Sequence, residues 1–320
     1  MHLLVTGGCG YVGSNLTKRL LNDGHKVTVV DVMWFGNYLE SHENLKIVQA
    51  DIRDIDIIPM KGVDSVIHLA NIANDPTGDL SPKLTWEVNV LASMHLVEKA
   101  IENGVKQFIY ASSGSVYGIK DELEVTEDLS LLPISDYNKT KMISERVLSS
   151  YRDKIILQII RPATVCGYSP RMRLDLSVNL LTMQALTSGK ITVFGGQQIR
   201  PNIHINDMTG VYLHFLELGE NAEGIYNAGY ENNSILDIAN QVAKHVPAEI
   251  EITKSNDPRS YRLNSDKLLG TGFTPKYSVS DGINDVVSAY GTGKIKDVSN
   301  CYNMKIMKKI LEFGRKSTNL

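Results

Sequence analysis

Short runs of β-branched and aliphatic residues alternate with amphipathic stretches over the first 160 residues of the chain. The runs predict strands, and the stretches, whose apolar positions recur at helical spacing, predict helices. We expect strands at residues 3–6, 26–30, 46–49, 65–69, 107–111 and 155–160, and helices at 11–21, 84–101 and 137–151. Strands and helices that alternate in this way build a parallel sheet with helices on both faces. The predicted fold class is therefore α/β, with a doubly wound parallel sheet.

The pattern changes after Arg161-Pro162. Helical stretches dominate there, strands become short and scattered, and Gly195-Gly196, Pro201 and Pro247 mark turns. We expect a first domain over residues 1–168, with a return of the chain to it near 200–230, and a smaller mixed α/β lobe over 169–320. The basic and polar residues 308–320 are expected to form a solvated helix end or a frayed tail.

The composition places the chain among ordinary globular proteins, with 42% hydrophobic and 22% charged residues in a length of 320. A balance of 33 Lys+Arg against 36 Asp+Glu argues against a nucleic-acid partner. The cysteines Cys9, Cys166 and Cys301 have no metal-ligand spacing, which predicts reduced thiols, no bound metal and a cytoplasmic location. Neither a signal peptide nor an apolar run of membrane-spanning length is expected.

Three glycines recur at every third position between the first strand and the first helix, in Thr6-Gly7-Gly8-Cys9-Gly10-Tyr11-Val12-Gly13. Glycines in this place allow a tight turn and let the backbone approach a diphosphate, which the N–H groups of the helix then bind. The loop predicts a Rossmann dinucleotide site made by Gly7, Gly10, Tyr11, Val12 and Gly13. The alternative is a tight strand-to-helix turn that binds nothing.

An acidic residue ends the second strand and favours NAD over NADP. Asp31 stands 18 residues beyond Gly13, where a carboxylate accepts hydrogen bonds from the adenosine ribose. The same carboxylate would repel the extra phosphate of NADP, and Val32 and Met33 follow it in place of a basic residue. Asp51-Ile52, after the third strand, is expected to cap the adenine, although Asp51 also suits a helix cap.

A phenol and an ammonium group, Tyr137 and Lys141, stand four residues apart on a predicted helix and so share one face. Tyrosine ordinarily titrates near pH 10, and we expect Lys141 and the positive nicotinamide ring of NAD to make Tyr137 more acidic. Tyr137 is then a general base for a hydroxyl group. Ser113, in the loop after the strand at 107–111, is placed to hold that hydroxyl. An amphipathic surface pair and a turn-forming serine are the alternatives.

These motifs together resemble the extended short-chain dehydrogenase/reductase family, in particular its nucleotide-sugar epimerases and dehydratases, the branch of UDP-galactose 4-epimerase. The resemblance covers nearly the whole chain and extends to His68-Leu69-Ala70, Asn89 and Arg161-Pro162. It implies that Leu69, Ala70, Asn89 and Ser112 line the NAD site, that Ser113, Tyr137 and Lys141 are catalytic, and that Tyr137 and Lys141 also contact the cofactor. It also implies a homodimer formed through the helices at 84–101 and 137–151.

The resemblance extends to residues that would hold a nucleotide-diphosphate sugar. Asn179, Arg200 and Arg262 match positions where the family grips the diphosphate, and guanidinium groups suit phosphate oxygens. The alternative for Arg200 and Arg262 is an ion pair between the two domains. His204 is expected to be a hydrogen-bonded strand residue and not a catalyst.

Departures from the family pattern narrow the expected reaction. Gly114 and Ser115 replace the Asp-Glu pair of the dehydratases, and a cysteine takes the place of Ser115 in enzymes that epimerise beside a carbonyl. Thr164 and Ala73 replace a substrate-binding Asn and a cofactor-binding Lys of the 4-epimerase, which puts UDP-galactose itself in doubt.

The predicted function is NAD-dependent oxidation of the C4 hydroxyl of a nucleotide-diphosphate sugar to a 4-keto sugar, by a 4-epimerase or a C4 dehydrogenase. Alternatives are a ketosugar reductase, a hydroxysteroid-type dehydrogenase and a non-catalytic NAD-sensing protein.

Overall fold

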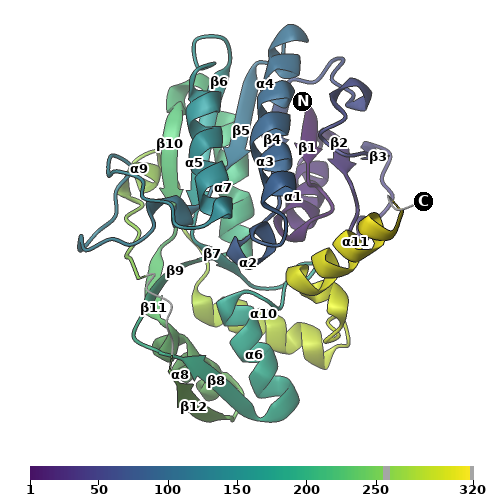
Figure 1. Cartoon of the computed structure of the whole chain (residues 1–320). Coiled ribbons are helices and arrows are strands. Elements are labelled where there is room, and N and C mark those ends of the chain that lie inside the picture. The colour runs from purple at the N-terminus through teal and green to yellow at the C-terminus, as the bar shows by residue number, and fades with distance from the viewer. Residues whose placement is uncertain (255–259, 318–320) are drawn as a thin grey trace.

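A seven-stranded parallel sheet forms the centre of the computed structural model, which describes residues 1–254 and 260–317 (Figure 1). The order of its strands is β10-β6-β5-β4-β1-β2-β3. The strands are β1 (His2–Thr6), β2 (Lys26–Asp31), β3 (Leu45–Gln49), β4 (Ser65–His68), β5 (Gln107–Ala111), β6 (Ile156–Pro162) and β10 (Gly224–Ala228). The predicted α/β class and its doubly wound parallel sheet are confirmed.

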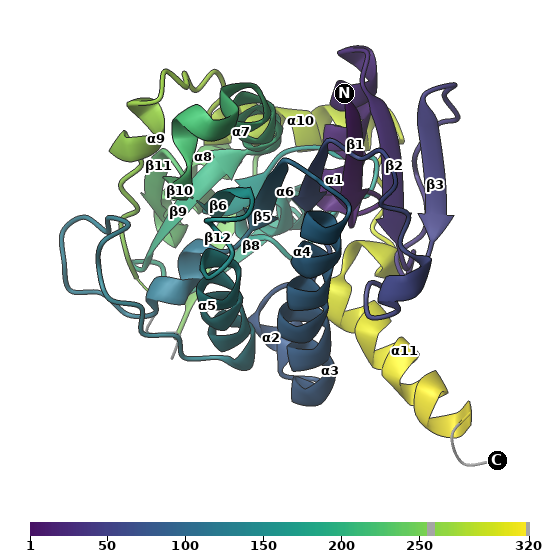
Figure 2. The same cartoon turned by 90° about the horizontal axis from the view of Figure 1, so that it is seen from above.

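Helices cover both faces of this sheet, as the view along it shows (Figure 2). In β1, Leu3 and Val5 enter the apolar core on one face, Leu4 enters the core on the other, and all three are fully buried. A strand covered on both faces reads as a continuous apolar run, which explains the uninterrupted apolar residues of β1. The helices on the first face are α1 (Tyr11–Asn22) and α7 (Ile205–Leu218), and those on the second are α4 (Ala92–Glu102) and α5 (Asp136–Ser149).

The strand order reverses between β1 and β4. The chain moves outward from β1 to β2 and β3, then crosses back to β4 and continues to β5 and β6 on the other side. In a parallel sheet such a reversal leaves a crevice at the carboxyl ends of the two strands, and ligands bind there. The fold therefore places the loops after β1 and β4 at the site.

A second group of elements lies below the sheet in Figure 1 and has an apolar core of its own. Its strands are β7 (Thr164–Cys166), β9 (Ile199–His204) and β11 (Glu231–Ser234) in one sheet, and β8 (Lys190–Phe194) and β12 (Glu249–Thr253) in another. Its helices are α6 (Ser177–Ser188), α8 (Ile235–His245) and α10 (Val279–Gly291). Between β9 and β11 the chain returns to the large sheet, where α7 packs on α1 and β10 pairs with β6.

The helix expected at 84–101 is interrupted. It consists of α3 (Pro82–Trp86), one π-helical turn η2 (Glu87–Leu91) and α4. Within the turn, Asn89 is fully buried, and its amide bonds both the N–H and the C=O of Ile72 and the hydroxyl of Thr140. We attribute the irregular turn to this inward asparagine, because π-helical turns commonly re-aim a single side chain.

The C-terminal segment forms the helix α11 (Asn303–Ser317). Helix α11 continues to Ser317, and Met307 at its start is buried in the core beneath α4. Lys308, Lys309 and Glu312 of this helix are exposed, which agrees with the solvated helix end expected there, and the last three residues lie outside the described part of the chain. The remaining short elements are η1 (Ile55–Ile57), α2 (Asp75–Gly78), η3 (Gly114–Tyr117), η4 (Gly219–Ala222), α9 (Asp266–Leu269) and η5 (Ser299–Cys301).

None of the helices within residues 1–254 and 260–317 has the length and apolar character needed to cross a membrane.

Candidate active site

The loop that joins β1 to α1 brings bare backbone to the crevice. Gly7 has a φ of +72°, a conformation that favours glycine. A Cβ at Gly7 would lie 2.7 Å from the backbone nitrogen of Ala70, and one at Gly13 would lie 2.1 Å from the carbonyl oxygen of Gly7. Because no side chain caps the start of α1 at Tyr11, the N–H groups of its first turn are open to an anion. This cradle fits the diphosphate of a dinucleotide.

A cavity of about 630 Å³ opens beside the loop, a volume typical of small-molecule sites. It brings together residues from the ends of β1, β2, β4 and β5 with residues of α5 and of the second lobe. The expected cofactor residues that line it are Gly7, Gly10, Tyr11, Val12, Gly13, Asp31, Asp51, Ile52, Leu69, Ala70, Ser112, Tyr137 and Lys141. Asn89 lies behind the lining and holds the chain at Ile72.

Asp31 ends β2 with its carboxylate held by two backbone groups. The N–H groups of Cys9 and Met33 donate to it at 3.0 and 2.7 Å. Burial nevertheless raises the pKa of Asp31 from its ordinary value, against the lowering effect of these two bonds. The side chain is therefore fixed in orientation at the place expected for the adenosine ribose, which supports the assignment of NAD.

Asp51 is also on the cavity wall, but it has a local partner. The guanidinium of Arg53 donates to both carboxylate oxygens, and its Nη1 donates to Glu87 at 2.9 Å. The backbone N–H of Arg53 donates to Asp51 as well. These bonds stabilise the turn after β3, so the carboxylate of Asp51 serves the fold as well as the cavity.

The three expected catalytic side chains meet at one end of the cavity. Tyr137 lies in the first turn of α5, which is capped by Ser135, and the Lys141 ammonium is 5.9 Å from the centre of the Tyr137 ring. The Lys141 ammonium also donates to the carbonyl oxygen of Ala111, at the end of β5. The hydroxyl of Ser113 is 2.7 Å from that of Ser115 and interacts with the phenol of Tyr137. The i, i+4 spacing therefore does place the phenol and the ammonium together.

The electrostatics of the protein alone run against the sequence-based expectation. Burial raises the pKa of Tyr137 to about 12, and the carboxylate of Asp75 adds to this, whereas Ser113 and Arg173 oppose it. Burial also lowers the pKa of Lys141 to about 7, against the effect of Glu145. The prediction that Lys141 makes Tyr137 acidic was wrong for the protein without its cofactor, because burial disfavours both charged forms.

A buried ion pair stands behind Lys141 and was not foreseen from the sequence. Glu145, one turn further along α5, accepts from Arg161 of β6 at 2.6 Å. The side chain of Arg161 is 3% exposed and that of Glu145 is 2% exposed. The hydroxyl of Ser112 donates to the same carboxylate, and Arg161 donates to the Tyr117 hydroxyl at 2.7 Å. Arg161 thus compensates the negative charge of Glu145, and the ammonium group of Lys141 faces the cavity.

The structure does not bring together the three residues that were predicted to bind the substrate, Asn179, Arg200 and Arg262. Arg200 of β9 lines the cavity, together with Thr164 and Ala73. Arg262 is exposed and lies outside the lining, and its backbone carbonyl accepts from the N–H of Val125. Asn179 is fully buried and also lies outside the lining.

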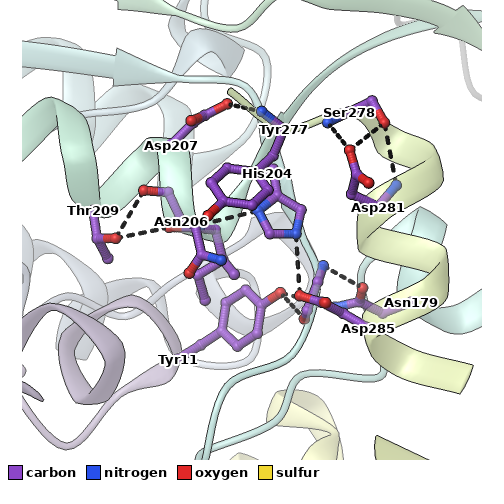
Figure 3. A network of polar contacts seen from close by, with 12 residues as sticks. Tyr11, Asn179, His204, Asn206, Asp207, Thr209, Tyr277, Ser278, Asp281 and Asp285 are labelled. Atoms are coloured by element: carbon purple, nitrogen blue, oxygen red, sulfur yellow. Dashed lines mark hydrogen bonds and ion pairs between the residues drawn. The ribbon is translucent and has the colours of Figure 1, made fainter. Parts of the chain in front are cut away.

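Asn179 instead ties the second lobe to the glycine loop (Figure 3). Its Oδ1 accepts from the N–H of Gly167, and its Nδ2 donates to the Tyr11 hydroxyl at 3.0 Å and to the carbonyl oxygen of Arg173. The Tyr11 hydroxyl in turn donates to the carbonyl oxygen of Gly167. With these bonds its amide is occupied by the protein itself, so the structure gives it a positioning role.

His204 lies in the same network, at the end of β9 (Figure 3). Its Nδ1 accepts from the N–H of Asn206 at 3.1 Å, which leaves the proton on Nε2, 3.1 Å from the carboxylate of Asp285. The ring stacks on Tyr277. His204 is therefore a hydrogen-bonded residue outside the cavity, as the sequence analysis expected.

Sequence reasoning missed several polar residues of the cavity wall. They come from two segments far apart in the chain, and they are Arg171, Arg173, Asp175 and Asn303, whereas Asn74 and Asp75, which also line the cavity, follow a predicted strand. The only local signal for them was the pair of arginines two residues apart that follows Pro170, in the segment where the chain enters the second lobe.

The structure combines a parallel sheet, a glycine loop at the point where the strand order reverses, and a tyrosine and a lysine that face the same cavity. These features together define a class of enzyme. The protein is an NAD-dependent enzyme of the extended short-chain dehydrogenase/reductase type. A model of the NAD dependent epimerase/dehydratase family matches residues 3–229, and the chain belongs to this family.

Relatives and solved structures of this family resemble the chain over most of its length. UDP-glucose 4-epimerase of Lactobacillus helveticus is 27% identical over 90% of this chain and 95% of its own. The structure of UDP-glucuronic acid 4-epimerase from Bacillus cereus, in complex with UDP-glucuronic acid and NAD, is 28% identical. It has a TM-score of 0.79 and covers 91% of this chain and 99% of its own. UDP-glucose 4-epimerase of Thermotoga maritima, with UDP-glucose, is 25% identical with a TM-score of 0.82, over 92% and 99% of the two chains.

Proposed function

We propose that the protein oxidises the C4 hydroxyl of a nucleotide-diphosphate sugar with bound NAD and returns the hydride to the other face, as a 4-epimerase. The observation that carries the proposal is the meeting of Ser113, Tyr137 and Lys141 in the cavity of the glycine loop. The names of the relatives, which are 4-epimerases of UDP-sugars, support the choice of carbon and of outcome.

Each residue of this group has a definite task in the proposed reaction. Tyr137 takes the proton of the C4 hydroxyl, and Ser113 holds the oxygen in line while a carbonyl forms. When bound, NAD supplies the hydride acceptor and a positive ring. A positive charge near Tyr137 lowers the pKa that burial has raised, so the phenol becomes a base only in the loaded site. The ammonium of Lys141, fixed on Ala111, is placed to hold the nicotinamide ribose.

The loop after β5 disfavours elimination of water as the main reaction. Gly114 has no side chain, and the hydroxyl of Ser115 is engaged, since it donates to Asn138 at 2.5 Å. A serine hydroxyl is also a far weaker acid than the carboxyl groups that dehydratases use at these positions. Oxidation and reduction at one carbon remain.

The substrate is best identified by incubating the purified protein with UDP-glucose, UDP-galactose, UDP-glucuronic acid and a set of GDP-, dTDP- and CDP-sugars. We expect one of them to be converted to its 4-epimer, with no net NADH. Build-up of NADH or release of a ketone would show a C4 dehydrogenase, and turnover only of a 4-keto sugar with added NADH would show a reductase. No conversion of any nucleotide sugar, with turnover of an apolar alcohol, would favour a hydroxysteroid-type enzyme.

Replacing Arg200 with Ala tests the diphosphate clamp. One charge-assisted hydrogen bond is worth roughly 1.5–3 kcal/mol, so we expect KM to rise about tenfold to a hundredfold with NAD affinity unchanged. Arg262→Ala is the matched control: it removes an arginine outside the cavity and should change KM less than about threefold. Equal effects of the two variants would contradict the clamp, and retained affinity in Arg200→Ala would favour an apolar substrate.

Three further expectations complete the proposal. Residues 1–168, with the return near 200–230, form the NAD domain, and 169–320 the sugar-binding lobe. The protein works in the cytoplasm. It forms a homodimer through α4 and α5, and Leu91, the residue before α4, is 50% exposed in the single chain. Light scattering of the purified protein measures this, and a monomer at micromolar concentration would contradict it.

A further inference from the structure

Arg171 is a buried cation that forms no ion pair with any residue of 1–254 or 260–317. Its side chain is 2% exposed, and its guanidinium lies 4.1 Å from the centre of the Phe35 ring. Its Nη2 donates to Oδ1 of Asn303, the first residue of α11, at 2.5 Å. Its Nε is buried and has no hydrogen-bond partner in the described part of the chain. A guanidinium carries five N–H donors, so this one is left largely unsatisfied.

The carboxylates around Arg171 compensate its charge only in part. Among the described residues, none of the carboxylates forms an ion pair with it, and Asp175, whose charge acts on it, is paired with Arg173 at 2.9 Å. Burial, together with the like charge of Arg173 and against the charge of Asp175, lowers the pKa of Arg171 to about 10. Fully buried arginines are nearly always paired, so this arrangement is unfavourable in the protein alone.

The position of Arg171 indicates which anion completes it. It lines the cavity together with Gly7, Gly10 and Asp31, and its charge acts on the carboxylate of Asp31. We propose that Arg171 binds the diphosphate of the dinucleotide from the second lobe, opposite the N–H groups of α1. The inference rests on the NAD cofactor of the family and not on the sugar chemistry proposed above.

The same contacts make the C-terminal helix part of the cofactor site. Asn303 orients Arg171 through its side chain, and its backbone N–H donates to Asp175 at 3.1 Å. Phe35, from the loop after β2, holds the other face of the guanidinium. Bound dinucleotide therefore joins the two lobes and α11, which slows its release from the cavity.

Binding of a series of ligands to Arg171→Met tests the proposal. After removal of any co-purified nucleotide, calorimetry on the full chain gives Kd for NAD, ADP-ribose, NADP and adenosine. We expect the Kd of NAD and ADP-ribose to rise at least about tenfold, and that of adenosine, which has no phosphate, less than about threefold. Equal losses for adenosine, or unchanged affinity for NAD, would overturn the proposal. A loss larger for NADP than for NAD would overturn it too, since it would assign Arg171 to the 2′-phosphate.

Asn303→Asp tests the proposed binding of the diphosphate by Arg171 without removing the arginine. The change keeps the shape of the side chain and gives Arg171 a carboxylate. We expect the melting temperature of the nucleotide-free protein to rise by roughly 2 °C or more and the Kd of NAD to rise at least about threefold, because the new carboxylate competes with the phosphate. Asn303→Ala is the control, which loses the hydrogen bond without adding charge and should not raise the melting temperature. A stabilised Asn303→Asp protein with unchanged NAD affinity would contradict the proposal even if Arg171→Met does not fold.

Discussion

Tyr137→Phe is expected to lower kcat by about 10²- to 10⁴-fold, the usual contribution of a positioned acid–base group. The substitution removes one oxygen and leaves the ring and the backbone of residue 137 in place, and that backbone lies beside Gly78 at the end of α2. Folding, melting temperature and NAD affinity should therefore change little. The measurement is steady-state conversion of the nucleotide sugar identified by the substrate panel, together with NAD binding by fluorescence.

Two companion variants separate the proposed task of Tyr137 from a mere effect on packing. Ser113→Ala removes the hydroxyl that holds the substrate oxygen and should lower kcat less than Tyr137→Phe does. Asp75→Asn removes the cavity carboxylate that raises the pKa of Tyr137. Unchanged turnover in Tyr137→Phe, with a severe loss in Asp75→Asn, would transfer the role of base to Asp75.

The fold was predictable because its signals are local. Apolar runs bounded by polar turns located six of the seven strands of the large sheet, with their ends within two residues, and glycine spacing located the cradle between β1 and α1. The edge strand β10 was not predicted. The interruption of the helix at 84–101 was not predictable in this way. It depends on a contact between Asn89 and Ile72, and hydrophobic periodicity records only which positions are apolar.

The site was predictable where it lies at strand ends. Ser112, Ser113 and Asp31 follow directly from that rule, and the i, i+4 spacing gave the tyrosine–lysine pair. Arg171 and Asn303 were missed because they meet only in the folded chain, 132 residues apart. Asn179 was assigned to substrate because sequence matching identifies a residue type and not the partner of its amide.

The direction of the Tyr137 pKa was missed for a different reason. The spacing of Tyr137 and Lys141 shows that a positive group lies near the phenol. The pKa of the phenol, however, depends on the balance between that charge and burial, and burial depends on how completely other elements cover the helix. Burial raises the pKa of Tyr137 and lowers that of Lys141, so in the protein alone loss of water outweighs the neighbouring groups that favour their charged forms.

The buried pair of Glu145 and Arg161 leads to the largest expected loss of stability. Arg161→Met removes the cation and leaves the carboxylate of Glu145 buried with the hydroxyl of Ser112 as its remaining hydrogen-bond partner among the described side chains. Breaking such a pair from one side costs about 3–5 kcal/mol, so we expect the free energy of unfolding in urea to fall by that amount. Mass action lets bound NAD recover part of it, so the comparison is made without nucleotide.

A double variant distinguishes the lost pair from simple loss of packing. In Glu145→Gln combined with Arg161→Met both charges are gone, and the unfolding free energy should recover by at least about half of the loss, because no uncompensated charge is left. The single Glu145→Gln variant should be destabilised like Arg161→Met, since it leaves the guanidinium buried with neutral partners. If the losses of unfolding free energy in the two single variants instead add up in the double variant, the pair stabilises the fold through side-chain packing. The charge state of Lys141 would then not depend on the ion pair.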